Sequence, residues 1–321
     1  MIASRGRAGA AFVVAMLVTE PLLADSAAPE APAASGSSVG APRKGALTEE
    51  PPKHRLEWNF PRFRYWEAGI ALVATGYFTY SVLQDPRRVD MGWHDPLPGD
   101  EPARNLFAAE GHAGRRKANN ASNTLWHITE FFPFADSIIV PLFFDDFNVD
   151  VAWQMTLLNW QGIAVMGAMN RVTHDWMGRD RPALKGCEEH GPEYSEEFCQ
   201  SDAPRVTQSF ISGHAASVFF GAGATCAHHT ALPMYGHPVA DIGVCVLALG
   251  AASTNGGLRM VADAHWLTDV LAGMLVGLGS GFGLAYGLHY ATPLKKLQQS
   301  GMMLVPLVGE DRAGVQLLGV L

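Results

Sequence analysis

Charged residues are scarce in this sequence. Asp, Glu, Lys and Arg make up 17% of its 321 residues, whereas hydrophobic residues make up 48%. Soluble proteins carry about 25% charged residues, so the composition favours a membrane protein or a very apolar helical one. The formal net charge is −8, and the sequence has no basic stripe of the kind that neutralises nucleic-acid phosphates. We therefore expect no nucleic-acid partner.

Cysteine is also rare, with four in the chain. None forms a CxxC pair or a His/Cys cluster with zinc spacing, so no metal site is expected. Cys226 and Cys245 lie in apolar segments, where buried free thiols are expected. Cys187 and Cys199 bracket a short acidic loop. We expect a disulfide between them, which needs an oxidising compartment; two unpaired loop thiols are the alternative.

Residues 1–24 have the features of an export signal. Two arginines precede an apolar run from Ala8 to Val18, and small residues follow at Ala24. A cleaved signal peptide and an uncleaved N-terminal anchor both fit this pattern. Residues 25–62 are the predicted disordered linker, because most of this segment is rich in Ala, Pro, Ser and Gly and lacks periodic apolar positions.

Residues 63–291 contain apolar segments of helical length. They predict an all-α domain of six helices, at about 68–83, 122–144, 151–173, 213–231, 239–255 and 264–289. Several are short or rich in Gly and Ala for a bilayer that requires about 20 apolar residues. A membrane bundle held by small-residue contacts is favoured over a soluble helical core. The tail, residues 292–321, has the pattern of a β-hairpin.

Basic residues flank the first and last predicted helices, at Arg55, Arg62, Arg64, Lys295 and Lys296. Such residues indicate a cytoplasmic end. A cleaved signal would place the linker outside, whereas six spans that end inside must also start inside. Either the signal is an uncleaved anchor, or one predicted helix does not cross the membrane.

The segment around the start of the last predicted helix contains His265 and Asp269, four residues apart. This spacing places both side chains on one helix face. The carboxylate can accept the Nδ1 proton of the imidazole and leave Nε2 as a nucleophile. Arg259 precedes them and can hold an anion near that nitrogen. A purely structural His/Asp hydrogen bond fits the same spacing.

Two earlier segments also favour an anion. Arg179 and Arg181 place two guanidinium groups close together, which suits a phosphate; a surface salt bridge is the alternative. Ser212 can cap the next helix, Gly213 allows close approach to its N–H groups, and His214 can protonate a leaving oxygen. A capping serine followed by an incidental histidine is the alternative there.

Chain geometry brings these segments together. About 45 residues separate His214 from Arg259, and they contain two predicted helices that run out and back. A helix of about 16 residues spans roughly 24 Å, so the chain returns to the level at which it started. All three segments therefore fall at one end of the bundle and predict a phosphate site.

The three segments, read in order, resemble the signature of the type 2 phosphatidic acid phosphatase superfamily, which includes class A acid phosphatases and vanadium haloperoxidases. The matching residues are Arg179-Asp180-Arg181-Pro182, Ser212-Gly213-His214 and Arg259-x5-His265-x3-Asp269, within a resemblance that covers about residues 120–290. It implies that His265 attacks phosphorus and forms a phosphohistidine, that Asp269 orients it, and that His214 is the general acid.

The same resemblance implies which groups stabilise the phosphate oxygens: Arg179, Arg181, Arg259, Ser212 and the Gly213 N–H. It implies no metal and no cofactor. The sequence departs from the family pattern at three positions. His174 replaces a lysine, Ile211 a proline and Leu258 a serine. Only the first change alters the charge near the phosphate.

These observations predict a six-helix bundle of the phosphatidic acid phosphatase/haloperoxidase type, embedded in a bacterial-type inner membrane with its active site facing the periplasm. The expected reaction is hydrolysis of a phosphate monoester or diphosphate, and the expected partner is a phosphorylated lipid such as phosphatidate or a polyprenyl diphosphate. The alternatives are a soluble periplasmic acid phosphatase, a vanadate-dependent haloperoxidase, and an inactive membrane scaffold.

Overall fold

The computed structural model describes residues 55–84, 93–195, 198–199 and 204–291, and the backbone of two strands beyond them. The predicted export signal, most of the predicted linker and the lysines after the last helix lie outside the described residues. The described part contains eight α-helices: α1 (Tyr65–Leu83), α2 (Asp100–Phe107), α3 (His112–Phe144), α4 (Val149–Trp176), α5 (Pro182–His190), α6 (Gly213–Ala231), α7 (Pro238–Val261) and α8 (Leu267–Leu278).

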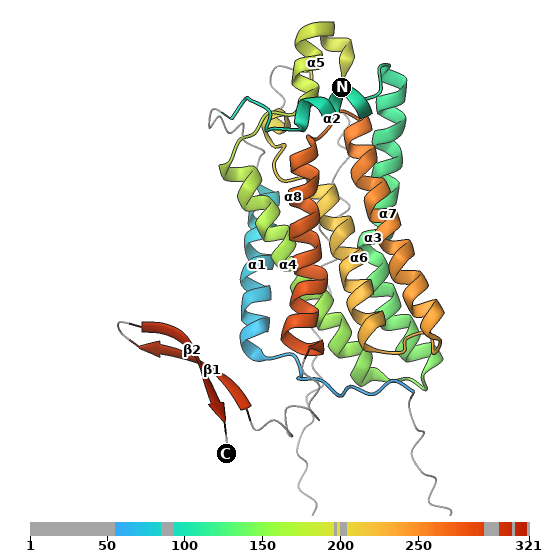
Figure 1. Cartoon of the computed structure of the whole chain (residues 1–321), viewed down its shortest axis with the longest axis vertical. Helices are drawn as coiled ribbons and strands as arrows, with labels where there is room; N and C mark the ends of the chain where they lie inside the picture. Colours follow the sequence, from blue (N-terminus) through green and yellow to red (C-terminus); the bar gives the residue numbers. More distant parts are fainter. Residues whose placement is uncertain are drawn as a thin grey trace, which may run out of the picture. The chain divides into compact units, whose positions relative to one another are not determined.

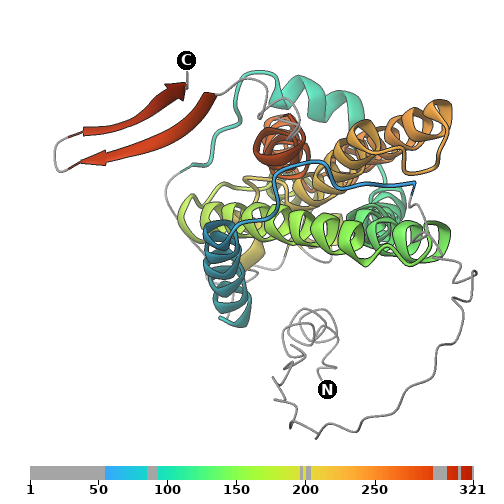
Figure 2. The ribbon, with the colours of Figure 1, turned by 90° about the horizontal axis from the view of Figure 1, so that it is seen from below.

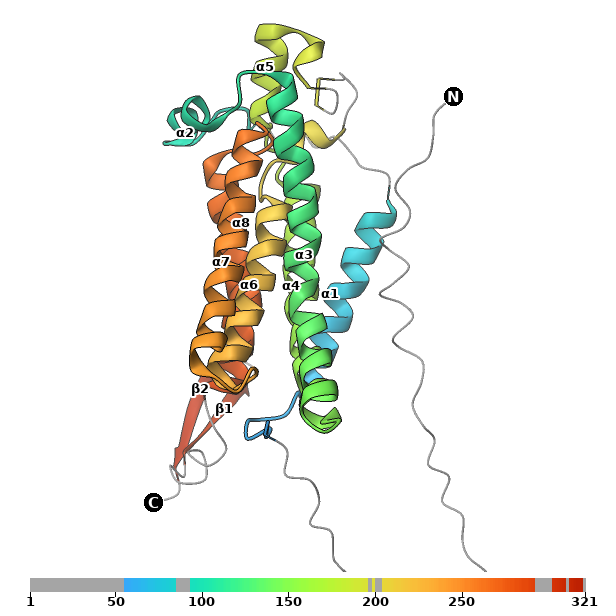
Figure 3. The same ribbon diagram turned by 90° about the vertical axis from the view of Figure 1, so that its right-hand side faces the viewer.

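The six long helices form a bundle around α6, which packs against α3, α4, α7 and α8 (Figure 1 and Figure 3). Almost every residue from Ala215 to His229 is buried. Small residues permit this close packing. A Cβ on Gly221 would lie 1.9 Å from the Thr129 carbonyl oxygen, and one on Gly277 would lie 2.3 Å from that of Ala216. Helix α1 packs on α4 at the side of the bundle (Figure 2).

Successive long helices alternate in direction. As a result, the end of α4, the start of α6 and the start of α8 lie at one end of the bundle, together with α2 and α5 (Figure 1). We call this the site end. The start of α1, the start of α7 and the end of α8 lie at the opposite end, which we call the far end.

All six predicted helical segments are helical, but the prediction of six helices is incomplete. Helices α2 and α5 lie in segments expected to be loops, because both are short and polar. Helix α3 begins ten residues earlier than expected, at His112. Helix α8 begins at Leu267, after His265, and continues through two π-helical turns, Gly279–Gly283 and Tyr286–Tyr290. In the tail, strands β1 (Met302–Gly309) and β2 (Arg312–Gly319) pair antiparallel.

Both cysteine pairs form disulfides. Cys187 and Cys199 are bonded, with their Cα atoms 5.3 Å apart. Cys226 and Cys245 are also bonded, with a Cα–Cα distance of 4.7 Å. The prediction of free thiols for this second pair is therefore wrong. Sequence separation concealed the contact, because the close antiparallel packing of α6 and α7 is what brings the two residues together.

The outer surface of the long helices is strongly apolar. Large hydrophobic side chains are exposed along α1, α3, α4, α7 and α8. Within the described residues, three helical segments are long and apolar enough to cross a membrane: His112–Phe144, Pro238–Val261 and Leu267–Tyr290. A surface of this kind is compatible with a membrane location.

Candidate active site

His265 lies in the loop between α7 and α8 and is buried. Its Nδ1 is 2.9 Å from the Ser209 carbonyl oxygen, and its Nε2 is 3.0 Å from Nη1 of Arg181. A carbonyl only accepts and a guanidinium only donates, so the ring carries its proton on Nδ1 and has a lone pair on Nε2. Burial, and next the charge of Arg181, lower the pKa of His265 well below its ordinary value. The side chain is thus neutral at neutral pH, as a nucleophile must be.

Asp269 does not hold His265 directly. Its Oδ2 is 3.8 Å from Nδ1 of His265, which is beyond hydrogen-bond distance. That oxygen instead accepts hydrogen bonds from Ser209 Oγ (2.6 Å) and the Trp266 N–H (2.9 Å). The expected shared helix face does not exist, because His265 precedes the first residue of α8. Ser209 therefore links the two residues: its hydroxyl binds Asp269 and its carbonyl binds His265.

Arg179 is almost completely buried and is held by two carboxylates. Its Nη2 donates to Asp100 at 2.5 Å, and its Nη1 donates to Asp269 and, at 2.8 Å, to Thr268 Oγ1. The ring of Trp93 lies 4.6 Å from the guanidinium carbon. In this arrangement Arg179 connects the start of α8 to α2. Its role as a phosphate ligand stays a prediction.

Arg181 faces His265. Beside its contact with His265, Nη1 donates to the Ala264 carbonyl at 2.7 Å, and Nη2 donates to the Gln208 carbonyl at 2.8 Å. Carbonyl groups on both sides therefore fix the guanidinium plane. This places a permanent positive charge next to Nε2 of His265, where a phosphate would be attacked.

Helix α3 contacts two further expected site residues, His214 and Arg259. His214, in the first turn of α6, has its Nε2 2.8 Å from Asn123 Oδ1. Arg259, at the end of α7, donates to Asn119 Oδ1 at 2.6 Å and to Ser122 Oγ at 3.0 Å. These α3 residues were not predicted from the sequence, although the asparagine-rich stretch 118–124 could have indicated them.

The histidines and arginines of the site also interact electrostatically. Burial, and next the charge of Arg259, lower the pKa of His214 well below its ordinary value, and the charges of Arg181 and Arg259 add to the effect of burial on the pKa of His265. The two histidines and two of the predicted arginines are therefore brought together at the site end. Among the described residues, no group of three His, Cys, Asp or Glu side chains could hold a metal ion.

The remaining predicted residues support the backbone around this centre. Ser212 caps α6 by accepting from the Ala215 N–H at 3.4 Å, and its own N–H donates to the Asp269 carbonyl at 3.1 Å. Gly213 leaves room for the Asn170 amide, which would lie 3.2 Å from an added Cβ.

The comparisons with known proteins bear on the same part of the chain. The model of the PAP2 superfamily matches residues 157–293. Over these residues, less than half of the chain, the protein is similar to that superfamily. Neither the search of curated proteins nor that of solved structures gave a match. The PAP2 match supports phosphatase-type activity, and the matched segment contains every site residue predicted from the sequence.

His174 is the departure from the PAP2 pattern that alters charge. It lies in the last turn of α4, and its Nε2 is 2.9 Å from the Ile211 carbonyl oxygen, to which it donates. This contact joins α4 to the segment just before Ser212. His174 thus braces the backbone of the site, in the position where the family pattern has a lysine.

Helix α2 lies outside the segment that the PAP2 model matches. Its side chains nevertheless bind the loop that carries His265 on both sides of that residue. On one side of His265, Arg104 binds Asp263 through two hydrogen bonds of 2.9 Å. On the other side, Asp100 accepts from the Thr268 N–H at 2.9 Å and from its hydroxyl at 3.0 Å. Neither α2 residue was predicted from the sequence, because their loop partners Asp263 and Thr268 lie 159 and 168 positions away.

Proposed function

We propose that this protein is a phosphatase that hydrolyses a phosphate monoester or diphosphate of a lipid through a phosphohistidine on His265. The observation that carries the proposal is the state of that residue: a neutral ring with its Nε2 lone pair directed at the guanidinium of Arg181. The arginine charge stabilises the phosphate oxygens and the histidine supplies the nucleophile, so the reaction needs no metal.

The chemistry follows from these positions. A phosphate oxygen replaces Nε2 of His265 as the acceptor for Arg181, and Nε2 attacks phosphorus. An N–P bond forms while the bond to the leaving oxygen breaks, and His214 gives its proton to that oxygen. His214 then takes a proton from water, which attacks phosphorus and releases phosphate from His265. A bound phosphate dianion offsets the positive charge of Arg259 beside His214, which favours the protonated ring that the first step requires.

The surface of the bundle supports a lipid substrate and a membrane location. The apolar exterior of the long helices suits contact with acyl chains. The Cys187–Cys199 disulfide joins α5, at the site end, to the segment that follows it. Disulfides persist in oxidising compartments, which supports a site end that faces the periplasm of a bacterial-type inner membrane. Extraction by carbonate without detergent would contradict this location.

The test of the catalytic proposal is phosphate release from a panel of lipid and soluble phosphates by the wild type and His265→Ala. Loss of a nucleophile leaves only binding and electrostatic contributions, so we expect the rate to fall by at least ~10³-fold. His237→Ala is the matched control, because His237 is exposed and caps α7 at the far end. Acid-labile ³²P labelling of the wild type, absent from His265→Ala, would show the intermediate. Comparable activity in His265→Ala would remove this residue from the role of nucleophile.

A further inference from the structure

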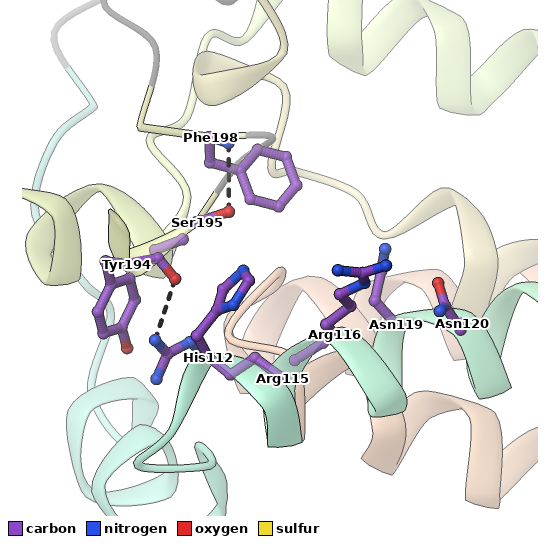
Figure 4. Close-up of a pocket in the computed structure, with 10 residues that line it drawn as sticks. His112, Arg115, Arg116, Asn119, Asn120, Tyr194, Ser195 and Phe198 are labelled. Carbon is purple, nitrogen blue, oxygen red and sulfur yellow. Dashed lines mark hydrogen bonds between the residues drawn. The ribbon is translucent and has the colours of Figure 1, made fainter. Parts of the chain in front are cut away.

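A pocket of about 190 Å³ opens at the site end beside the first turns of α3 (Figure 4). Its walls come from α3, α5, the segment after α5 and the α7–α8 loop. The lining contains three basic side chains (His112, Arg115, Arg116), three neutral polar ones (Asn119, Asn120, Ser195) and four others (Ala183, Tyr194, Phe198, Ala262). No carboxylate is among these lining residues, so the pocket favours an anion.

Two of its lining residues contact the catalytic arginines. Asn119 accepts the 2.6 Å hydrogen bond from Arg259, and the Phe198 ring lies 4.8 Å from the guanidinium carbon of Arg181. Asn123, which holds His214, lies about one helical turn farther along α3. Asn119 and Phe198 thus lie between the pocket and the groups around His265, so the pocket adjoins the proposed phosphate site.

The two adjacent arginines in the pocket have different tasks. Arg115 is buried, donates to the carbonyls of Ala109, Glu110 and Tyr194, and lies 3.6 Å from the centre of the Tyr194 ring. It therefore builds the wall. Arg116 is exposed, and no hydrogen bond or ion pair occupies its guanidinium in the described part of the chain. Figure 4 shows it on the pocket side of α3.

We propose that this pocket, through Arg116, binds a second anionic group of the substrate while His265 attacks the first. The inference rests on the proposed phosphatase function and narrows its substrate to phosphate esters that carry another phosphate or carboxylate. The planar guanidinium matches either oxyanion with two parallel hydrogen bonds. Arg116 and the other α3 residues of the pocket lie outside the segment that the PAP2 model matches, whereas its other wall lies inside that segment.

The experiment measures binding of alkyl monophosphonates and of α,ω-alkyl bisphosphonates of increasing length to the purified full chain by calorimetry. One charge-assisted arginine contact corresponds to about tenfold in affinity. We expect bisphosphonates of suitable length to bind about tenfold more tightly than the matched monophosphonates, and this gain to disappear in Arg116→Gln. Lys117→Gln removes the same charge from the next, exposed residue, which does not line the pocket, and keeps the gain.

Two results would overturn the subsite: no bisphosphonate binds better than its monophosphonate, or the gain survives in Arg116→Gln. Phosphate release by the same preparations separates this question from the catalytic one. A bisphosphonate gain that depends on Arg116, without any phosphate release by the wild type, would refute the phosphatase and keep the anion subsite. Phosphate release by the wild type without a bisphosphonate gain would keep the phosphatase and refute the anion subsite.

Discussion

Asp100 is the residue through which α2 holds the catalytic loop, and its replacement by asparagine tests that arrangement. The carboxylate is fully buried and accepts from Arg179, from the N–H and hydroxyl of Thr268, and from the Leu97 N–H. Asn has nearly the same shape, but it removes the charge and turns an amide group toward donors. Arg179 then keeps only Asp269 as a charged partner.

Breaking a buried ion pair costs about 3–5 kcal/mol. Because Arg179 retains one carboxylate, we expect the lower value, about 3 kcal/mol, which corresponds to roughly 100-fold in an equilibrium constant. Asp100→Asn should therefore reduce kcat/KM for phosphate release by roughly 10–100-fold and lower the thermal unfolding midpoint, since the start of α8 loses its anchor.

Glu101→Gln provides the control for this measurement. Glu101 is the next residue of α2, and its ion pair with Lys185 is exposed, so its loss should cost between about 0 and 1 kcal/mol. Phosphate release and unfolding are measured on both variants in the same detergent. If Asp100→Asn matches Glu101→Gln in both assays, α2 does not position the catalytic loop.

Three further predictions concern the centre and its surroundings. Ser209→Ala removes a buried hydrogen bond to the Asp269 carboxylate, worth about 1.5–3 kcal/mol, and should lower kcat about 10–100-fold; unchanged kcat would show that Ser209 does not link Asp269 to His265. The lowered pKa of His265 keeps its ring neutral at more acidic pH than an ordinary histidine, whose pKa is about 6.5. We therefore expect kcat/KM to decline only below about pH 6.5. A decline centred above that pH would contradict this reasoning. Replacing Cys187 and Cys199 by serine opens a 12-residue loop and should cost about 3 kcal/mol of unfolding free energy, seen as a lower thermal midpoint.

Local patterns in the sequence were sufficient to predict the long helices. Apolar segments of helical length predicted the long helices, and the cap at Ser212 begins α6 as expected, because the serine side chain and the first-turn N–H groups are neighbours in the chain. The out-and-back geometry of two antiparallel helices predicted that His214 and Arg259 return to one end. Each of these inferences depends on interactions within a few residues or on helix length alone.

The four-residue spacing of His265 and Asp269 wrongly predicted that they share a helix face, because His265 lies in the loop just before α8. His265 and Asp269 are four apart, but α8 begins at Leu267, so the loop directs the imidazole to the Ser209 carbonyl. The partners of Arg179 show the same limit: Asp100 and Asp269 lie on different helices, 79 and 90 positions away. Two arginines that look equivalent in the sequence therefore have different partners: Arg179 binds two carboxylates, and Arg181 faces His265.

The sequence by itself predicted the helical class and the end of the bundle at which the candidate site residues gather, and it made His265 the candidate nucleophile, because these inferences depend on local periodicity and on residue type. Only the tertiary structure decided the tautomer of His265, the role of Ser209, the clamp from α2 and the anion pocket along α3. These depend on distances of about 3 Å between residues remote in the chain, and such distances are set by how the helices pack.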